Sequence, residues 1–173
     1  MTFILQDPEN EDTQFLLETI LESSIDATKG AAMFSFASST GAKMLLCDDI
    51  FREFAARSSF DLVIGIDAVT NTEALAAISE ATADFNGVNC KVFLHQRPMA
   101  LFHPKVCWFG TDTRGMFISG SGNLTLGGLR SNWEAYASIE IDEHAIHTIE
   151  DTWNEWTRRH DVKLRNLADP EVI

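Results

Sequence analysis

The chain has 173 residues, of which 45% are hydrophobic and 23% are charged, so fibrous and intrinsically disordered classes are excluded for the chain as a whole. This length suits one domain with one core, which we predict to span residues 1–173. Thirteen basic residues against 26 acidic ones give a formal net charge of −13, which argues against non-specific affinity for nucleic acid or anionic membranes.

Strands and helices alternate in the first half of the chain. Apolar runs bounded by turn residues predict the strands, and apolar residues at helical spacing predict the helices. In chain order these elements are a short strand at 3–5, a helix at 11–28, a strand at 31–37, a helix carrying residues 45–54, a strand at 61–67 and a helix at 72–85. Two consecutive strand–helix units imply parallel pairing within one sheet.

After Asn86 the pattern changes to four strands with little helix between them, at about 90–95, 103–109, 115–121 and 133–141. A final helix over 142–160 places Trp153 and Trp156 on one apolar stripe, where they suit either the core or a subunit interface. The predicted fold class is α/β, with a mixed sheet flanked by helices on both faces.

The N-terminal segment, which is acidic from Asp7 onward, lacks the basic start and apolar stretch of a signal peptide. No run approaches the roughly 20 apolar residues that a membrane span needs. The three cysteines have no CxxC spacing, so they indicate neither a disulfide framework nor a zinc site. We therefore expect a cytoplasmic, reduced protein without a membrane partner.

The segment FHPKVCWF carries the first chemical signal. In a strand, side-chain alternation would place His103 and Lys105 on one face. Cys107 would share that face, either lining a site or serving as a small buried hydrophobe. An imidazole and an ammonium group aimed at one spot are suited to binding an anion.

A second signal follows in GSGNLT, where glycines allow the backbone to approach a ligand closely and Asn123 offers an amide. Ser121 adds a hydroxyl, and Glu134 follows in SNWEA. Residues 86–132 hold five basic residues and one acidic residue, so these motifs lie in a basic segment of an acidic chain. Arg97 and Arg130 in this segment are candidates for substrate contact, with an ordinary surface position as the alternative.

His103-Pro104-Lys105 followed by Gly120-Ser121-Gly122-Asn123 resembles the HxK and GSxN motif of the phospholipase D superfamily. The longer GSGNLTxxGL with a later Asn-x-Glu is similar to the nuclease and restriction-endonuclease branch. The likeness covers residues 102–134. The superfamily's usual aspartate would fall at Gly110, so Glu134 is the candidate to replace it.

The resemblance implies a metal-independent phosphodiesterase without a cofactor, most simply a nuclease acting on DNA or RNA through a phosphohistidine at His103. Lys105 and Asn123 would bind the non-bridging oxygens with help from Ser121, and Glu134 would orient the imidazole. The family uses two copies of the motif and this chain has one, so the resemblance implies a homodimer with a shared site. The alternatives are a non-catalytic or partner-regulated binding module and, less well supported, a phospholipid hydrolase.

Overall fold

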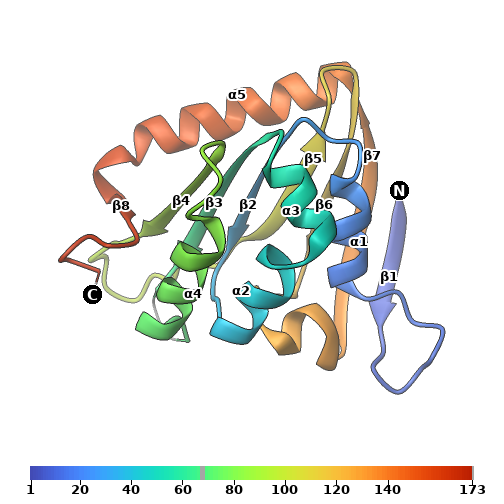
Figure 1. Ribbon diagram of the computed structural model, residues 1–173, viewed down its shortest axis with the longest axis horizontal. Helices are drawn as coiled ribbons and strands as arrows, with labels where there is room; N and C mark the ends of the chain where they lie inside the picture. The colour runs from blue at the N-terminus through green and yellow to red at the C-terminus, as the bar shows by residue number, and fades with distance from the viewer. Residues whose placement is uncertain (67–68, 173) are drawn as a thin grey trace.

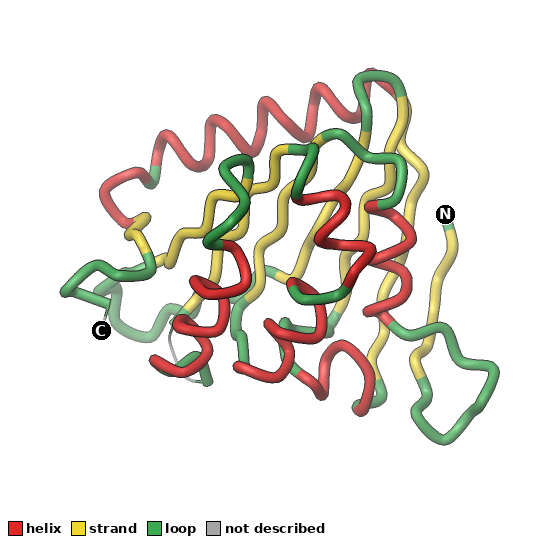
Figure 2. Tube along the Cα trace, viewed as in Figure 1, coloured by secondary structure: helices red, strands yellow, loops and turns green. Residues whose placement is uncertain are grey.

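The computed structural model describes residues 1–66 and 69–172, and its centre is an eight-stranded sheet with the order β1-β7-β6-β5-β2-β3-β4-β8 (Figure 1). The strands are β1 (Thr2–Gln6), β2 (Lys29–Phe34), β3 (Ser59–Gly65), β4 (Val88–Phe93), β5 (Lys105–Gly110), β6 (Arg114–Gly120), β7 (Glu134–Asp142) and β8 (Leu164–Asn166). The two ends of the chain lie at opposite edges of this sheet, as the trace in Figure 2 shows.

The sheet is mixed, as predicted. Strands β2, β3 and β4 pair in parallel, because a helical segment after β2 and another after β3 return the chain to the end of the sheet where the preceding strand began. The neighbours β5, β6, β7 and β1 are all antiparallel, starting with the pairing of β5 with β2. In that pair Phe34 lies opposite Lys105 and Lys29 lies opposite Gly110.

The helices are α1 (Leu16–Ser24), α2 (Ser39–Leu46), α3 (Asp49–Ala55), α4 (Thr72–Thr82) and α5 (Glu143–Arg159). The first four cover one face of the sheet and contribute to the main core, whereas α5 crosses the other face (Figure 1). Trp153 and Trp156 of α5 pack there against a smaller cluster that includes Met33 and Val63. The predicted α/β class with helices on both faces is confirmed, and the two tryptophans pack within the chain.

The main core is dense in aromatic rings. Phe60 and Phe109 stack at 5.5 Å between ring centroids, and Phe51 and Phe54 meet Phe60 edge-on at 5.2 and 5.9 Å. These four side chains are at most 1% exposed. Edge-to-face and stacked pairs of this kind add to the free energy gained from burial. They attach α3 to the centre of the sheet.

Several predicted boundaries were wrong. The first helix begins at Leu16 rather than Glu11, since turns occupy the segment before it. The helix predicted over 45–54 is two helices, because the Asp48 carboxylate caps a new helix by accepting from Ile50 N at 2.9 Å. The strand predicted at 61–67 is β3, and its predicted last residue lies outside the described part of the chain. The three-residue β8 was not predicted.

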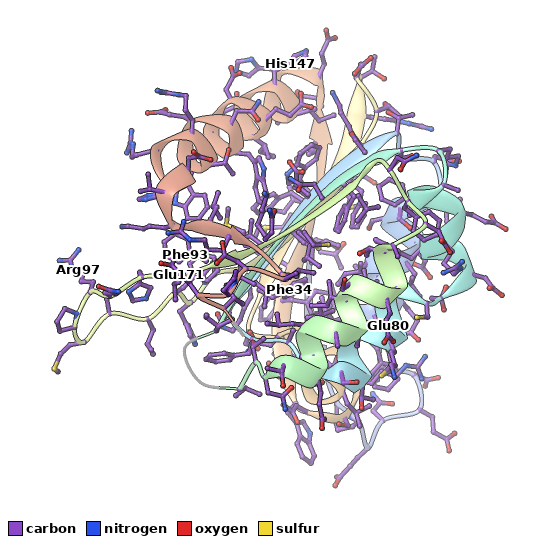
Figure 3. All side chains as sticks on the ribbon, turned by 60° about the vertical axis from the view of Figure 1, so that its left-hand side comes forward. Phe34, Glu80, Phe93, Arg97, His147 and Glu171 are labelled. Carbon is purple, nitrogen blue, oxygen red and sulfur yellow. The ribbon has the colours of Figure 1, made fainter. Side chains whose placement is uncertain are left out.

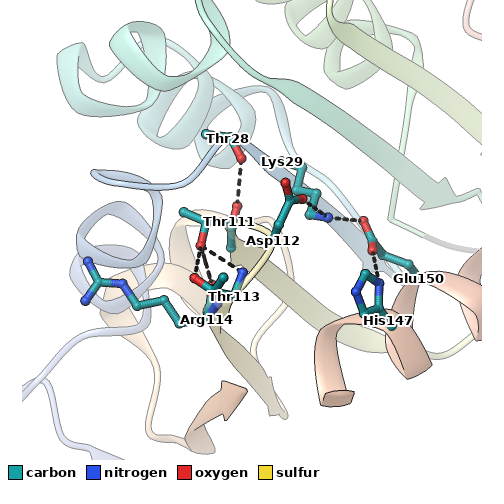
Figure 4. Close-up of polar contacts among 9 residues, drawn as sticks. Thr28, Lys29, Thr111, Asp112, Thr113, Arg114, His147 and Glu150 are labelled. Carbon is teal, nitrogen blue, oxygen red and sulfur yellow. Dashed lines mark hydrogen bonds and ion pairs between the residues drawn. The ribbon is translucent and has the colours of Figure 1, made fainter. Parts of the chain in front are cut away.

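At the end of the sheet where β2 begins, one lysine joins three elements (Figure 4). Lys29 Nζ lies 2.9 Å from Asp112 Oδ1 in the β5–β6 turn and 2.8 Å from Glu150 Oε1 on α5. His147 Nδ1 lies 3.6 Å from the other oxygen of Glu150. Burial of Lys29 alone would lower its pKa, but the hydrogen bonds to Glu150 and Asp112 outweigh burial and raise the pKa.

Within the described residues, no helix combines the length and the apolar character needed to cross a membrane.

Candidate active site

The motif residues lie at the opposite end of the sheet from Lys29, where four strands bring their ends together. Ser35 follows the last residue of β2, and Lys105 is the first residue of β5. Asn123 follows the end of β6, and Glu134 begins β7. β2 is antiparallel to β5, β5 to β6, and β6 to β7. These four strand ends therefore lie at the same end of the sheet. Ser35 and Glu134, which are 99 positions apart in sequence, are thereby placed at the same end of the sheet.

The strand predicted over 103–109 begins two residues later than expected. β5 starts at Lys105, and His103 and Pro104 precede it as extended chain. Pro104 has no N–H to give to a ladder, so pairing begins only after it. His103 is exposed, and its ring meets Phe36 edge-on at 6.0 Å between centroids. The imidazole is therefore exposed to solvent at this end of the sheet.

Lys105 lies directly against the imidazole. Its Nζ is 3.1 Å from both His103 ring nitrogens, and donates to Ser35 Oγ at 2.9 Å. Ser35 is fully buried and donates in turn to the Pro104 carbonyl at 3.1 Å. Burial lowers the pKa of Lys105, while the nearby charge of Glu134 acts in the opposite direction. Ser35 was not predicted, although a serine that interrupts the apolar run of residues 31–37 was a visible signal.

Asn123 is held by the chain that continues from β2. Its Oδ1 accepts from Phe36 N at 3.2 Å, which turns the NH₂ group away from that backbone. No hydrogen bond from this NH₂ group is seen within the described residues. The next residue, Leu124, forms a parallel bridge with Ala37, so the GSGNLT loop runs beside the extension of β2. The Asn123 amide is thus positioned and has an unused donor.

Two glycines allow this close packing. A Cβ built on Gly128, in the π-helical turn Gly127–Ser131, would lie 2.3 Å from Asn123 N and 2.4 Å from Asn123 O. A Cβ on Gly41 at the start of α2 would lie 2.4 Å from Leu124 O. Neither contact leaves room for a side chain, because real Cβ atoms do not approach backbone so closely. Both sides of the Asn123 loop are therefore fixed by direct backbone contact.

Glu134 and Ser121 form a second polar group at the same end of the sheet. Ser121 Oγ hydrogen-bonds Glu134 Oε2, and it also accepts from Ala135 N at 3.0 Å. The other carboxylate oxygen, Glu134 Oε1, accepts from Asn132 Nδ2 at 3.1 Å. In the described residues no hydrogen bond joins Glu134 to His103, so Glu134 is linked to the motif through its bond to Ser121 and through its electrostatic effect on Lys105. Asn132 is the asparagine of the Asn-x-Glu pattern, and it was not among the predicted site residues.

The remaining candidates have separate positions. The Arg130 guanidinium forms an ion pair with Glu18 and lies over the Phe15 ring, 5.2 Å from its centroid. Arg97 lies on the loop that projects beyond Phe93, as Figure 3 shows. Cys107 packs in the main core, and burial raises the pKa of its thiol, so it serves as a small hydrophobe.

Gly110, the position of the family's usual aspartate, lies at the far end of β5, and Asp112 beyond it is paired with Lys29. No group of three or more potential metal-ligating side chains occurs among the residues described. Gly110 and Asp112 are therefore both remote from the end of the sheet where His103 lies.

These features define a fold class: the chain has the phospholipase D fold, and the resemblance predicted from the motifs is confirmed at the level of fold. No family model matches the sequence, and no curated protein matches it. The likeness is therefore structural, carried by the arrangement of the sheet and helices.

Three solved structures illustrate it. NucT from Helicobacter pylori is 11% identical with a TM-score of 0.63, covering 95% of this chain and 97% of that one. Nuc from Salmonella typhimurium, a phospholipase D family member, is 14% identical with a TM-score of 0.60, covering 95% of each chain. Yeast tyrosyl-DNA phosphodiesterase is 16% identical with a TM-score of 0.53, covering 82% of this chain and 32% of that chain.

Replacement of Gly128 by alanine tests the packing around Asn123. We expect Gly128→Ala to lower the free energy of unfolding by about 1–3 kcal/mol, because the new methyl group meets the Asn123 backbone. Gly127→Ala is the matched control, since its Cβ meets only the movable side chain of Asn132. Urea denaturation of both variants measures the difference. Equal stability of the two variants would contradict the close approach.

The two lysines of the β2–β5 pair should titrate differently. Because the Lys105 pKa is lowered and the Lys29 pKa is raised, Lys105 holds more neutral amine at any pH below both values. Pulsed acetylation followed by peptide mass spectrometry should give a half-maximal labelling rate at lower pH for Lys105 than for Lys29. Glu134→Gln should shift the Lys105 profile further down, because it removes a charge that raises this pKa. A Lys105 profile at or above that of Lys29 would refute this view of the site.

Proposed function

We propose that the protein is a metal-independent phosphodiesterase, a nuclease that acts through a phosphohistidine at a site shared by two subunits. Two observations support the proposal: Lys105 contacts the His103 ring, and Asn123 is bonded to Phe36, whose own ring meets the His103 ring. An exposed imidazole beside two hydrogen-bond donors matches the needs of phosphoryl transfer, which are a nucleophile and groups that stabilise negative oxygens. Among the similar structures, Nuc is a phospholipase D family member and the yeast protein is a tyrosyl-DNA phosphodiesterase, and both names favour the same chemistry.

In the first step a ring nitrogen of His103 attacks phosphorus, and a P–N bond forms as the P–O bond to the leaving group breaks. In the second step water attacks the phosphohistidine, the P–N bond breaks and the imidazole is restored. Lys105 and the Asn123 amide would bind the non-bridging oxygens in both steps. The substrate phosphate would take the place of the direct contact between Lys105 and the His103 ring.

Ser121 and Glu134 have supporting roles in this proposal. The Ser121 hydroxyl donates its one proton to Glu134, and it would become a further donor to the phosphate oxygens by exchanging that bond. Glu134 would orient the imidazole only by exchanging its bond to Ser121 or Asn132 for one to His103. Arg97 and Arg130 would contact the substrate backbone, Arg130 after release from Glu18.

The leaving oxygen needs a proton, and this calls for a general acid. The sequence has one HxK motif, so a second copy of the chain would supply the second His103. Exposed apolar side chains beside the site support such a contact: Phe3 and Leu5 on β1 are 64% and 68% exposed, and Trp133 is 63% exposed. Leu5 pairs with Ala135 and Trp133 directly precedes Glu134, whereas Phe3 lies farther along β1, opposite Ala137. Aromatic side chains of this kind are enriched at protein interfaces.

The net charge of −13 favours a second candidate, a phospholipase D-like binding module that is silent or regulated by a partner protein. A polyanion is repelled by such a surface within about 8 Å at physiological salt. Absence of nucleic-acid cleavage at low salt, together with absence of phosphate on His103, would make this the leading candidate.

Nuclease activity should survive chelation and depend on His103. We expect labelled oligonucleotides to be cleaved in excess EDTA, and His103→Asn to reduce the rate by at least about a thousandfold because the nucleophile is lost. Asn123→Ala should lose about a hundredfold, in keeping with the removal of one donor to the developing charge. His144→Asn, on the surface of α5, is the control. Activity lost in EDTA or retained in His103→Asn would reject the assignment, and release of choline in place of nucleotides would indicate a phospholipid hydrolase.

The dimer is tested separately. We expect light scattering at micromolar concentration to give twice the chain mass of 19.3 kDa. Leu5→Glu should give the single mass and lose cleavage, because a buried, unpaired carboxylate opposes association. Val162→Glu, at an exposed position near the other sheet edge, should leave the mass unchanged. An active wild-type monomer would exclude the shared site.

A further inference from the structure

A groove of about 420 Å³ opens beside His103 on the face of the sheet that carries α5. One wall is the loop between β4 and β5, including His95 and Arg97, and the other wall is the end of α5. His103 lines the groove and also contacts Lys105, so the groove adjoins the candidate site. Apart from the backbone contact proposed for Arg97, the proposed function does not use the rest of this groove.

The groove is floored by aromatic rings. Phe93 and Phe102 stack at 4.6 Å between centroids, and Trp156 lies 5.4 Å from Phe93. His160 lies 4.9 Å from Trp156, and both are only half-buried, so part of each ring faces the groove. Burial, with the charges of Lys163 and Arg159, lowers the pKa of His160, so this ring is neutral at neutral pH. These rings form a continuous apolar surface beside the nucleophile.

The basic side chains among the described lining residues of the groove give it a positive charge. Arg97 and Lys163 line the groove, and none of its described lining residues is acidic. The Arg97 guanidinium has no ion-pair partner among the residues that the structure describes. By contrast, a cavity of about 670 Å³ at the other end of the sheet is lined by four acids and by Arg114; the acids are Glu22, Asp26, Glu140 and Asp142. In a chain with a net charge of −13, a groove with cations and no described acid suits an anionic ligand.

Packing of α5 accounts for part of this surface only. Phe93 and Phe102 are buried against Met33 and Trp156 and would be present in any helix–sheet contact. Packing does not require Arg97, which projects on its loop away from the core (Figure 3). Nor does it require the open faces of Trp156 and His160. Stacking surfaces beside cations are the combination by which proteins hold single-stranded nucleic acid.

We propose that this groove binds the base of a nucleotide next to the scissile phosphate, so that the substrate of the His103 site is single-stranded nucleic acid. The inference rests on the proposed function and names its substrate class. A base inside a duplex is stacked on both faces by its neighbours and cannot enter the groove, whereas an unpaired base can. Trp156 and His160 stack on the base, and Arg97 and Lys163 bind the adjoining phosphate.

Binding to a silent protein tests the groove without catalysis. His103→Asn protein is titrated into a fluorescein-labelled DNA pentamer, into the same pentamer lacking its bases, and into a hairpin duplex, at 50 mM salt. Stacking of one base predicts about a ten- to hundredfold tighter Kd for the pentamer with bases than for the abasic one. The duplex should bind no better than the abasic strand. Equal Kd values for all three ligands would overturn the proposal.

Variants locate the effect. Trp156→Leu should remove most of the preference for bases, whereas Trp153→Leu, one turn earlier on α5 and bonded to Asp61 at 3.3 Å, should keep it. Arg97→Ala should weaken binding of both pentamers about equally, and Lys43→Ala, an exposed cation on α2, should weaken neither. Arg97 lies on an exposed loop, so this arm stays informative even when Trp156→Leu does not fold. An unchanged preference in folded Trp156→Leu, or unchanged binding in Arg97→Ala, would place the base elsewhere.

The outcomes separate the two proposals. Base-dependent binding by His103→Asn without any cleavage by the wild type would overturn the nuclease and leave a groove that binds single strands. Cleavage of single and double strands at equal kcat/KM, with no effect of Trp156→Leu, would keep the nuclease and reject the groove as a base site. Trp156 would then serve only to attach α5.

Discussion

The antiparallel pairing of β5 with β2 is the constraint on which the candidate site depends. It sets the end of β2, and with it Ser35, opposite the start of β5, where Lys105 lies. A six-residue strand spans about 20 Å. If β5 ran parallel to β2, Lys105 and His103 would lie at the other end of the sheet, beside Lys29. The antiparallel pairings of β5 with β6 and of β6 with β7 bring the end of β6 and the start of β7 to the same end of the sheet. The three pairings together place the four strand ends that form the candidate site.

Close backbone packing then fixes what the pairing brings together. Asn123 cannot move toward Gly128 or away from Phe36 without a clash or the loss of a hydrogen bond. The Lys105 ammonium group donates to the buried Ser35 hydroxyl, which itself donates to the Pro104 carbonyl. These two hydrogen bonds hold Lys105 in place. The donors are thus oriented before any ligand arrives, which is the condition under which hydrogen bonds stabilise developing charge most effectively.

The two ends of the same strand pair treat their lysines in opposite ways. Lys29 is neutralised by Asp112 and Glu150 and joins α5 to the sheet. Lys105 has hydrogen bonds to Ser35 and His103 and no ion pair in the described residues, and burial lowers its pKa. In a chain of net charge −13, a lysine left without a carboxylate partner is the one that remains available to an anion. The acidic residues neutralise the structural lysine and leave the lysine at the candidate site available.

The sequence by itself determined the order of β1 to β7, the mixed α/β class and the motif residues, because apolar periodicity and local motifs are properties of neighbouring positions. It missed β8 and the division between α2 and α3. It did not determine that Ser35 supports Lys105, that Asn132 binds Glu134, or that Trp156 and His160 lie beside His103. Ser35 and Lys105 are 70 positions apart, Trp156 and His160 are 53 and 57 positions from His103, and Asn132 is two positions from Glu134. Apart from Asn132 and Glu134, these arrangements depend on strand pairing and on the path of α5 across the sheet. Only tertiary structure decided these long-range arrangements, since no local spacing encodes which strand ends meet at the same end of the sheet.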